Sequence, residues 1–462
     1  MFTLRDMETA LLGAPDTPVG RDFAVTGVAT DSRSVNKGDA FFCIEGENFD
    51  GHHFAPQAVK HGARVVVASR LMPELERTPV LLVPDTVLAL GRLAAFRRQG
   101  THARVVAVTG SAGKTTVKEL LASVAGHGLA VSKSAGNFNN QIGLPLSIFR
   151  AADDADLWIL ELGISKPHDM DELGPVAAPD LAVIHNIGPA HLEGLGSIEG
   201  VARAKASLLR HLAPGGRAVV NRDYPELWAE ATAIRPDAVG FSTTDPDCDY
   251  FCTLTGRTPE GRGLFRVKTR AMDETLELPA CGAHHAENVA AVACAAHLLG
   301  LAPSALREGL AESRALKQRF VCRTQGRMTL IDDTYNANPK SMLAAMRAAK
   351  DMAEGRPLVL VLGEMKELGE LAAEEHKALG RAARELAPAL LLWKGAHADD
   401  VAEGFGPASP AMAPTASPAE TARRFASLGL GEAVVLVKGS RSCRMEEHAA
   451  ALTQCMFNKD AA

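Results

Sequence analysis

A glycine-rich turn between an apolar run and a helical pattern constrains the fold of this chain more than any other stretch. Residues 105–108 are apolar, Thr109 continues a mostly β-branched run, and Gly110–Thr116 (GSAGKTT) follows directly. Apolar residues then recur at helical spacing from Val117 to Val124. A strand, a glycine-rich loop and a helix N-terminus in this order bind phosphate groups, because backbone N–H groups and the helix dipole both favour anions. The pattern predicts a nucleotide-phosphate site in an α/β domain.

Two residues of this loop have distinct expected roles. We expect Lys114 to reach the terminal phosphates and the Thr115 hydroxyl to coordinate Mg²⁺. Val108 stands where the longer GxxxxGK[ST] pattern has its first glycine, so the loop has the shorter GxxGK[ST] form. A short pattern arises by chance more readily in a chain with 41 glycines. The strand before it and the helix after it are what make the prediction specific.

Composition limits the class of protein. A chain of 462 residues with 47% hydrophobic residues has room for two to four globular domains of about 100–200 residues each. The net charge of −6 and the scattered Lys and Arg residues give no electrostatic footprint for nucleic acid. The eight cysteines show no metal-binding spacing, and no apolar stretch approaches the roughly 20 residues of a membrane span. We expect a cytoplasmic protein with reduced thiols.

The pattern of apolar runs divides the chain into three α/β domains. Residues 1–98 predict a small mixed α/β domain. In residues 99–317, strand-like runs alternate with helical ones around the phosphate loop, which predicts a mostly parallel sheet. Residues 318–462 alternate again, without a phosphate loop, and predict a Rossmann-like domain. Ligands in open α/β sheets lie at the carboxyl ends of the strands, so the residues just after each strand are candidates for function.

Two strand ends near the phosphate loop carry candidate metal ligands. Glu161 ends the run Leu157–Leu162, and Mg²⁺ usually binds one or two carboxylates together with phosphate oxygens. His191 lies in the loop after the next expected strand, Leu181–Ile187. The alternative for each residue is a solvent-exposed side chain without a ligand, and position alone leaves both interpretations open.

Lys205 is the most unusual residue of the chain. It lies in the middle of an apolar stripe on a helix expected from Ser197 to Leu212. One interpretation is a lysine whose stem is buried and whose ammonium reaches water. The other is a lysine held inside a site, where desolvation lowers its pKa and leaves a nucleophilic amine. Such an amine can add CO₂ and become a carbamate that holds a metal.

In this order along the chain, the segments resemble those of the Mur ligases over nearly its whole length. The family-wide marks are Thr109–Thr116, Glu161–Gly163, Asn186–His191, Lys205, Asn288, Arg319 and Asp333. Further stretches are similar to the branch of the family that adds D-alanyl-D-alanine: Thr30–Arg33, Phe41–Phe54, Gly136–Pro145, Asp332–Pro339, Gly363–Gly369 and Lys438–Ser442. The DNPR turn with which the preceding ligase recognises diaminopimelate is absent from the sequence.

The resemblance implies an ATP-dependent amide ligase of peptidoglycan precursor synthesis. Such an enzyme joins D-alanyl-D-alanine to UDP-N-acetylmuramoyl tripeptide through an acyl phosphate. The implied cofactors are ATP, two Mg²⁺ ions and a CO₂-derived carbamate on Lys205. The implied protein is a cytoplasmic monomer that binds small-molecule substrates, with no nucleic acid or membrane partner.

The resemblance also implies roles for individual residues. The catalytic residues are Lys114, Glu161, His191 and Lys205. One Mg²⁺ is held by Thr115 and Glu161, and the other by His191 and carbamylated Lys205. The residues implied to bind ATP are Gly110, Ser111, Ala112, Gly113, Lys114, Thr115, Thr116, Asn288, Arg319, Asp333, Tyr335 and Asn336. Those implied to bind the other substrates are Ser32, Arg33, Gly46, Asp50, His52, Asn137, Asn140, Lys438, Ser440 and Arg441.

Two departures and two rival functions remain at this point. His285 replaces the Asn usual in the family's HN turn, and Gln318 replaces the Gly that usually precedes the arginine. The first rival is a related ligase that adds glutamate to folate, which should lack the Phe41–Phe54 turn. The second is a nucleotide-binding regulatory protein, for which the second metal site at His191 and Lys205 would have no use.

Overall fold

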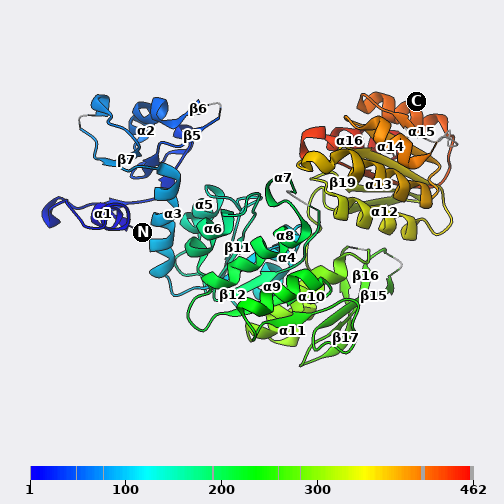
Figure 1. Cartoon of the computed structure of the whole chain (residues 1–462), viewed down its shortest axis with the longest axis horizontal. Helices are drawn as coiled ribbons and strands as arrows, with labels where there is room; N and C mark the ends of the chain where they lie inside the picture. The colour runs from blue at the N-terminus through cyan, green and yellow to red at the C-terminus, as the bar shows by residue number, and fades with distance from the viewer. Residues whose placement is uncertain are drawn as a thin grey trace.

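The chain folds into three successive α/β parts. The computed structural model describes residues 2–47, 49–75, 77–189, 192–258, 260–280, 282–406 and 412–457. Figure 1 shows the first and last parts standing apart from each other, each beside the middle part. None of the described helices is both long and apolar enough to cross a membrane.

The first part is built on a parallel sheet with the strand order β3-β4-β7-β8. Its central strands are fully buried because helices and turns cover both faces. Asp85 caps the long helix α3, since its carboxylate accepts the N–H groups of Val87 and Leu88. The elements are β1 Phe2–Thr3, α1 Leu4–Leu12, β2 Ala24–Val25, β3 Val28–Ala29, β4 Ala40–Phe42, β5 Glu45–Gly46, β6 Phe49–Asp50, α2 Ala55–His61, β7 Val65–Ala68, β8 Val80–Leu82 and α3 Thr86–Gln99.

The middle part is a six-stranded parallel sheet in the order β10-β11-β9-β12-β13-β14. The four strands expected from the sequence are β9 Arg104–Thr109, β11 Leu157–Glu161, β12 Leu181–Ile184 and β13 Arg217–Asn221. The others are β10 Val131–Lys133 and β14 Val239–Phe241. The helices are α4 Lys114–Ala125, α5 Gly143–Arg150, α6 Asp169–Ala177, α7 Leu192–Leu195, α8 Ile198–Ala206, α9 Pro225–Ile234, α10 His285–Leu298 and α11 Pro303–Ala311.

Strand β12 is shorter than expected because the residues after it turn toward the phosphate loop. The expected strand ran to Ile187, whereas β12 ends at Ile184. The Asn186 carbonyl accepts the Ser111 N–H at 3.1 Å. The backbone groups that would have extended the ladder therefore hold the loop.

An antiparallel sheet in the middle part was not expected from the sequence. Its strands are β15 Phe251–Arg257, β16 Gly263–Lys268 and β17 Asp273–Leu278. Phe265 and Val267 point into the same core as Val289 of α10. The alternation of buried and less buried residues along β16 is the signal that identifies such a strand. This sheet supports α10, whose N-terminus lies at the candidate site.

The third part is a second six-stranded sheet in the order β18-β19-β23-β20-β21-β22, parallel except for β18. The alternation expected there is confirmed, and the edge strands β18 and β22 are additions. Strands are β18 Val321–Gln325, β19 Met328–Asp333, β20 Leu358–Gly363, β21 Leu390–Lys394, β22 Met412–Pro414 and β23 Ala433–Lys438. Helices are α12 Pro339–Ala353, α13 Ala372–Glu385, α14 Ala398–Phe405, α15 Pro418–Ser427 and α16 Met445–Phe457.

Candidate active site

The turn between β9 and α4 has the geometry of a phosphate loop. Gly113 precedes the helix with φ 78°, which favours glycine. A Cβ on Gly113 would lie 2.6 Å from Asn288 Oδ1 and 2.7 Å from His185 Cε1, so there is no room for a side chain. Lys114 Nζ donates to the Gly110 carbonyl at 2.8 Å. Burial lowers the pKa of Lys114, while the nearby Glu161 carboxylate favours its charge.

Asn186 fixes the first half of the loop. Its Oδ1 accepts the N–H groups of Ser111 at 3.1 Å and Ala112 at 3.0 Å, and the side chain is buried. The sequence identified Asn186 only as part of the segment after β12. The structure gives it a definite task, which is to set the direction of two N–H groups at the phosphate end of the loop.

Thr115 and Glu161 lie side by side at the end of the loop. The Thr115 hydroxyl donates to Glu161 Oε2 at 2.9 Å, and Asn139 Nδ2 donates to Glu161 Oε1 at 2.8 Å. Glu161 is 2% exposed, so it is not the solvated strand end that was its alternative. Lys118 Nζ lies 3.9 Å from Glu161 Oε2. Burial of this carboxylate is therefore balanced by a cation and two hydrogen-bond donors.

Lys118 is a functional candidate that the sequence analysis missed. It is fully buried and donates to the carbonyls of Ser134 at 2.7 Å and Gly136 at 3.1 Å. Its signal in the sequence is weak, because it directly follows the loop on a helix that begins with Lys114. The contacts indicate that Lys118 anchors the segment before the Asn137–Asn140 turn.

Lys205 is 1% exposed, on α8, near the phosphate loop. A lysine whose ammonium reached water would be partly exposed, so this burial excludes that interpretation. Burial lowers the pKa of Lys205 far below its usual value, and the charge of Lys114 lowers it further. The expected single helix from 197 to 212 is α8 followed by a tighter 3-10 turn, Ser207–His211. His191, the proposed partner of Lys205, lies outside the described residues.

Buried polar atoms without partners gather at the N-terminus of α10. Within the described residues, Asn288 Oδ1, His285 Nε2 and His185 Nε2 make no hydrogen bond. Asn288 Nδ2 lies 3.3 Å from His285 Nδ1. Unpartnered buried polar atoms are costly unless a ligand completes them. A heteroaromatic base that offers an amino group and ring nitrogens fits this set.

The C-terminal part contributes cations and a carboxylate to the same site. Arg319 Nη2 donates to Thr115 Oγ1 at 3.1 Å, and its guanidinium lies 3.9 Å from the Tyr335 ring centroid. Lys438 Nζ pairs with Asp333 Oδ2 at 2.7 Å and donates to the Asn336 carbonyl at 2.9 Å. Lys438, which the resemblance assigned to the other substrates, lines the same cavity as the phosphate loop and Asp333.

Gln318, one of the two departures, adopts φ 62°, a region that glycine occupies without strain. This explains why the family uses glycine there. The Gln318 side chain accepts from Arg441 Nη1 at 3.2 Å, and its carbonyl accepts the Tyr335 N–H at 3.1 Å. Gln318, whose backbone is strained, thus connects the segment that leaves the middle part to Tyr335 and Arg441 of the C-terminal part.

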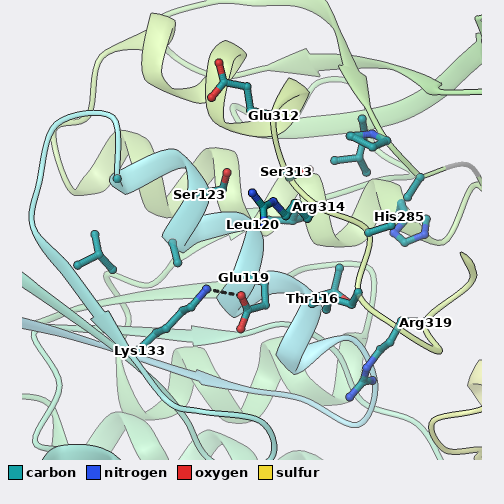
Figure 2. A pocket seen from close by; sticks show the side chains of 18 residues that line it. Thr116, Glu119, Leu120, Ser123, Lys133, His285, Glu312, Ser313, Arg314 and Arg319 are labelled. Carbon is teal, nitrogen blue, oxygen red and sulfur yellow. Dashed lines mark hydrogen bonds and ion pairs between the residues drawn. The ribbon is translucent and has the colours of Figure 1, made fainter. Parts of the chain in front are cut away.

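Two cavities flank the phosphate-loop helix. A cavity of about 420 Å³ holds the phosphate loop, Glu161, Asn288, Asp333, Tyr335, Asn336, Lys438 and the asparagines Asn137, Asn139 and Asn140. A second cavity of about 480 Å³ lies along α4 (Figure 2), between Thr116, Leu120 and the linker 312–316. His285 and Arg319 line both. The first of these cavities is the one equipped for chemistry, because it contains the loop, the carboxylates and the unpartnered base-binding atoms.

The residues assigned to the UDP end lie in the first part, away from this cavity. Arg33 is 82% exposed on its side chain and is paired with Asp31. His52 is buried, with Nδ1 2.7 Å from Asp50 Oδ1 and Nε2 accepting the Ser69 N–H. His52 therefore holds its own turn, next to Gly46 of β5, and the exposed Arg33 is the group available to a ligand.

Three other predicted substrate residues have local partners. Ser32 is buried and donates to Gln57 Oε1 at 3.1 Å. Asn140 Oδ1 accepts the Gly143 N–H at 2.8 Å at the start of α5. Ser440 is buried and its hydroxyl accepts the Lys366 N–H at 3.0 Å. These contacts shape turns beside the sites and are compatible with backbone recognition of a ligand.

Together, the fold and the cavity define a class of P-loop proteins in which two α/β parts enclose one nucleotide. Models of Mur ligase domains match the chain over residues 24–98 (Mur ligase family, catalytic domain), 108–296 (Mur ligase middle domain) and 318–441 (Mur ligase, glutamate ligase domain). The chain belongs to the Mur ligase family.

The relatives are similar over most of the chain. UDP-N-acetylmuramoyl-tripeptide–D-alanyl-D-alanine ligase of Escherichia coli is 36% identical over 442 residues, 94% of this chain and 95% of that protein. The crystal structure of MurF from Acinetobacter baumannii has a TM-score of 0.87 at 31% identity and covers 98% of this chain and 99% of that one. MurF from Thermotoga maritima, solved with ADP, has a TM-score of 0.84 at 28% identity, with coverage of 94% and 99%.

Proposed function

We propose that this protein joins D-alanyl-D-alanine to UDP-N-acetylmuramoyl tripeptide, with ATP converted to ADP and phosphate. The supporting observation is that relatives matched over most of their length carry this activity in their names, while this chain has a cradle for ATP, formed by the phosphate loop and the charged side chains around it. At its phosphate end the Thr115 hydroxyl donates to Glu161 and accepts a hydrogen bond from Arg319. The folate-ligase and regulatory alternatives have no comparable support.

The reaction brings two anions together, and the cationic side chains of the cradle make this feasible. A carboxylate oxygen of the tripeptide attacks the γ-phosphorus of ATP, and ADP leaves with the electron pair of the broken P–O bond. The amine of D-alanyl-D-alanine then attacks the acyl carbon and loses a proton, and inorganic phosphate leaves. Lys114 and Arg319 balance the charge that accumulates on the transferred phosphoryl group.

Thr115 and Glu161 fit a magnesium ion. They offer a hydroxyl and a carboxylate oxygen, 2.9 Å apart, beside the phosphate loop. Oxygen ligands next to phosphates are the donor set that Mg²⁺ prefers. When bound, Mg²⁺ would draw negative charge from the phosphate oxygens. We assign the second ion to His191 and to Lys205.

We propose that Lys205 carries a carbamate. Its amine is buried and its pKa is lowered, so it is neutral enough to add to CO₂. The charge of Lys114 also lowers the pKa of Lys205, so Lys114 would attract a carbamate anion and repel an ammonium there. The modification therefore replaces a neutral amine with an anion that the Lys114 cation favours.

We further propose a role for each part. Residues 1–98 bind the UDP end, 99–317 bind ATP and the metals, and 318–462 complete the nucleotide site and meet D-alanyl-D-alanine. One chain supplies both sides of the cradle, which supports a monomer as the working form. ATP and UDP-linked precursors are cytoplasmic metabolites, so we assign the reaction to the cytoplasm.

The decisive experiment measures ADP release with single and paired substrates. ADP should form at a steady rate only when UDP-N-acetylmuramoyl tripeptide and D-alanyl-D-alanine are both present. Comparison of tripeptides with meso-diaminopimelate or lysine at the third position identifies the natural one. Steady ADP release with folate and glutamate, or without any acceptor, would contradict the proposal.

A further inference from the structure

A polar chain connects the C-terminal part to the phosphate loop through residues that take no part in the proposed chemistry. Lys340 is the second residue of α12, on the C-terminal part. Its Nζ lies 3.1 Å from Glu287 Oε2 and 3.2 Å from Glu287 Oε1, and it also donates to the Tyr224 hydroxyl. Glu287 and Tyr224 belong to the middle part, so these contacts cross between the two parts.

The chain continues from Glu287 to the loop itself. Asn186 Nδ2 donates to Glu287 Oε2 at 3.0 Å. The Oδ1 atom of the same amide accepts the N–H groups of Ser111 and Ala112. The Glu287 carboxylate, together with His185 Nδ1 at 2.7 Å from the same nitrogen, therefore holds the amide in the orientation that orients the loop. Rotation of this amide by 180° would turn an NH₂ group toward two N–H groups and lose both hydrogen bonds.

The setting makes the connection specific. A Cβ on Gly188 would lie 3.1 Å from Lys340 Cδ, so the glycine lets the lysine stem lie against the middle part. Glu287 is enclosed by Lys340, Tyr224, Asn186 and His185. Burial opposes the charge of Glu287, but these neighbours lower its pKa below the usual range, with Lys340 the largest of them. Burial lowers the pKa of His185 to about 4, so Lys340 supplies the balancing charge.

We propose that Lys340 and Glu287 form an interdomain latch that positions the phosphate loop through Asn186. When the C-terminal part docks, Lys340 fixes Glu287, Glu287 fixes the Asn186 amide, and the amide presents the loop N–H groups to the nucleotide phosphates. The residues are positioning residues for the proposed reaction, and to that extent the inference rests on the proposed function. Nucleotide binding tests it independently of ligation.

The test is a double-mutant cycle read out by titration of the full-length enzyme with ADP. Lys340→Met keeps the stem against Gly188 and removes the charge, and Glu287→Gln removes the partner charge. Each change should raise the Kd of ADP about tenfold, and the double variant should be no weaker than either single variant. Lys340→Arg should restore most of the affinity. Lys350→Met, on the exposed face of α12, is the matched control and should bind ADP normally.

The outcomes separate the latch from direct contact with ADP. If Lys340 touched the nucleotide itself, Lys340→Met would weaken binding equally with and without Glu287, and this additivity would overturn the proposal. Normal ADP binding by Lys340→Met would also overturn it. If Glu287→Gln does not fold, Tyr224→Phe replaces it in the cycle, since the hydroxyl bonds both Lys340 and Glu287. If the variants change ADP binding as expected but the unmodified enzyme does not ligate the two substrates, the latch stands and the proposed function is refuted.

Discussion

The middle and C-terminal sheets have the same architecture but prepare their carboxyl edges in different ways. At the middle sheet, β9 ends in a glycine turn, and backbone N–H groups at the start of α4 form the phosphate end of the site. At the C-terminal sheet, β19 and β23 end in Asp333 and Lys438, which pair with each other. One edge binds with the backbone and the other with charged side chains.

The difference shows which edge tolerates substitution. A backbone cradle depends on chain conformation, as the close approach of Asn288 and His185 to Gly113 shows. A side-chain cradle depends on compensation, because Lys438 is nearly inaccessible and needs its partner. Changes at the middle edge should therefore affect catalysis first, and changes at the C-terminal edge should affect stability and nucleotide affinity together.

The largest effect is expected for Lys205, behind the middle edge. Lys205→Ala should lower turnover by about a thousandfold or more, because it removes a proposed metal ligand. Added formate or acetate should partly restore activity by filling the anionic position. Arg203→Ala, an exposed neighbour paired with Glu230, is the control and should remain active. Near-normal activity of Lys205→Ala would refute the carbamate.

Lys114→Ala should reduce kcat/KM for ATP by about a hundredfold, since a cation at the transferred phosphoryl group is lost. Lys114 Nζ donates to a carbonyl of its own loop, so the fold should persist. The melting temperature of the variant should no longer rise with ATP and Mg²⁺ as it does for the unmodified protein. An unchanged rise would show that the loop binds phosphate without this lysine.

Asp333→Asn tests the side-chain edge. The change leaves Lys438 buried beside a neutral amide, which should destabilise the C-terminal part by about 2 kcal/mol. Calorimetry should show its transition moving to lower temperature. Asp333→Asn together with Lys438→Met should recover most of the stability but little of the ATP affinity. Equal loss in the single and double variants would mean that the pair is not the cause.

Each sheet also encloses a histidine whose pKa burial lowers to about 4, His185 in the middle part and His448 in the C-terminal part. The unfolded chain binds these protons near pH 6.5, so the stabilisation is complete above pH 6.5 and is lost as the pH falls toward 4. The slope is about 1.4 kcal/mol per pH unit for each histidine in that window.

Replacement of His448 separates the two parts. It contacts Thr421 Oγ1 and Lys394 Nζ in the C-terminal core. In His448→Gln, the transition of the C-terminal part should lose most of its dependence on pH between 6.5 and 4, while that of the middle part keeps it. A parallel shift of both transitions would indicate one cooperative unit.

The smallest effect is expected for Arg33, which lies in the first part of the chain, outside both six-stranded sheets. Arg33→Ala should raise KM for the UDP-linked substrate about threefold and leave kcat unchanged, because an exposed anchor acts equally on the ground and transition states. KM for ATP should not change. A fall in kcat would mean that the first part takes part in closure rather than in anchoring alone.

The sequence pointed to the candidate site residues whose signal is local, at a strand end or within one helix. The phosphate loop, Glu161 and the buried Lys205 were recognisable because each interrupts a regular apolar pattern. The contacts of Lys118 and Lys340 were not, since a lysine near a helix start is ordinary in sequence and acquires meaning only from partners far along the chain. The pairing of Lys438 with Asp333 was not recognisable for the same reason, since it joins the ends of two neighbouring strands that lie far apart in the sequence.

The fold was predictable to a similar depth. Buried parallel strands such as β9 and β20 are continuous apolar runs, which predict strands directly from the sequence. The antiparallel strands β15–β17 carry polar residues on one face. Residues such as Thr255 and Arg266 interrupt the apolar pattern, so these strands do not appear as apolar runs in the sequence. Edge strands β18 and β22 are exposed or short, so their pairing depends on the sheet that receives them.

The chain passes from the middle part to the C-terminal part once, and that crossing contains three basic residues within six positions. Arg314 and Lys317 are exposed, whereas Arg319 is held between Thr115 and the Tyr335 ring. Trypsin would recognise all three residues. Cleavage after a residue that is held by contacts requires local unfolding that breaks those contacts, so an exposed residue is cut sooner. The peptide bond after Arg319 should therefore be cut late when the two parts are in contact and early when they are apart. The pattern of fragments measures closure without any label.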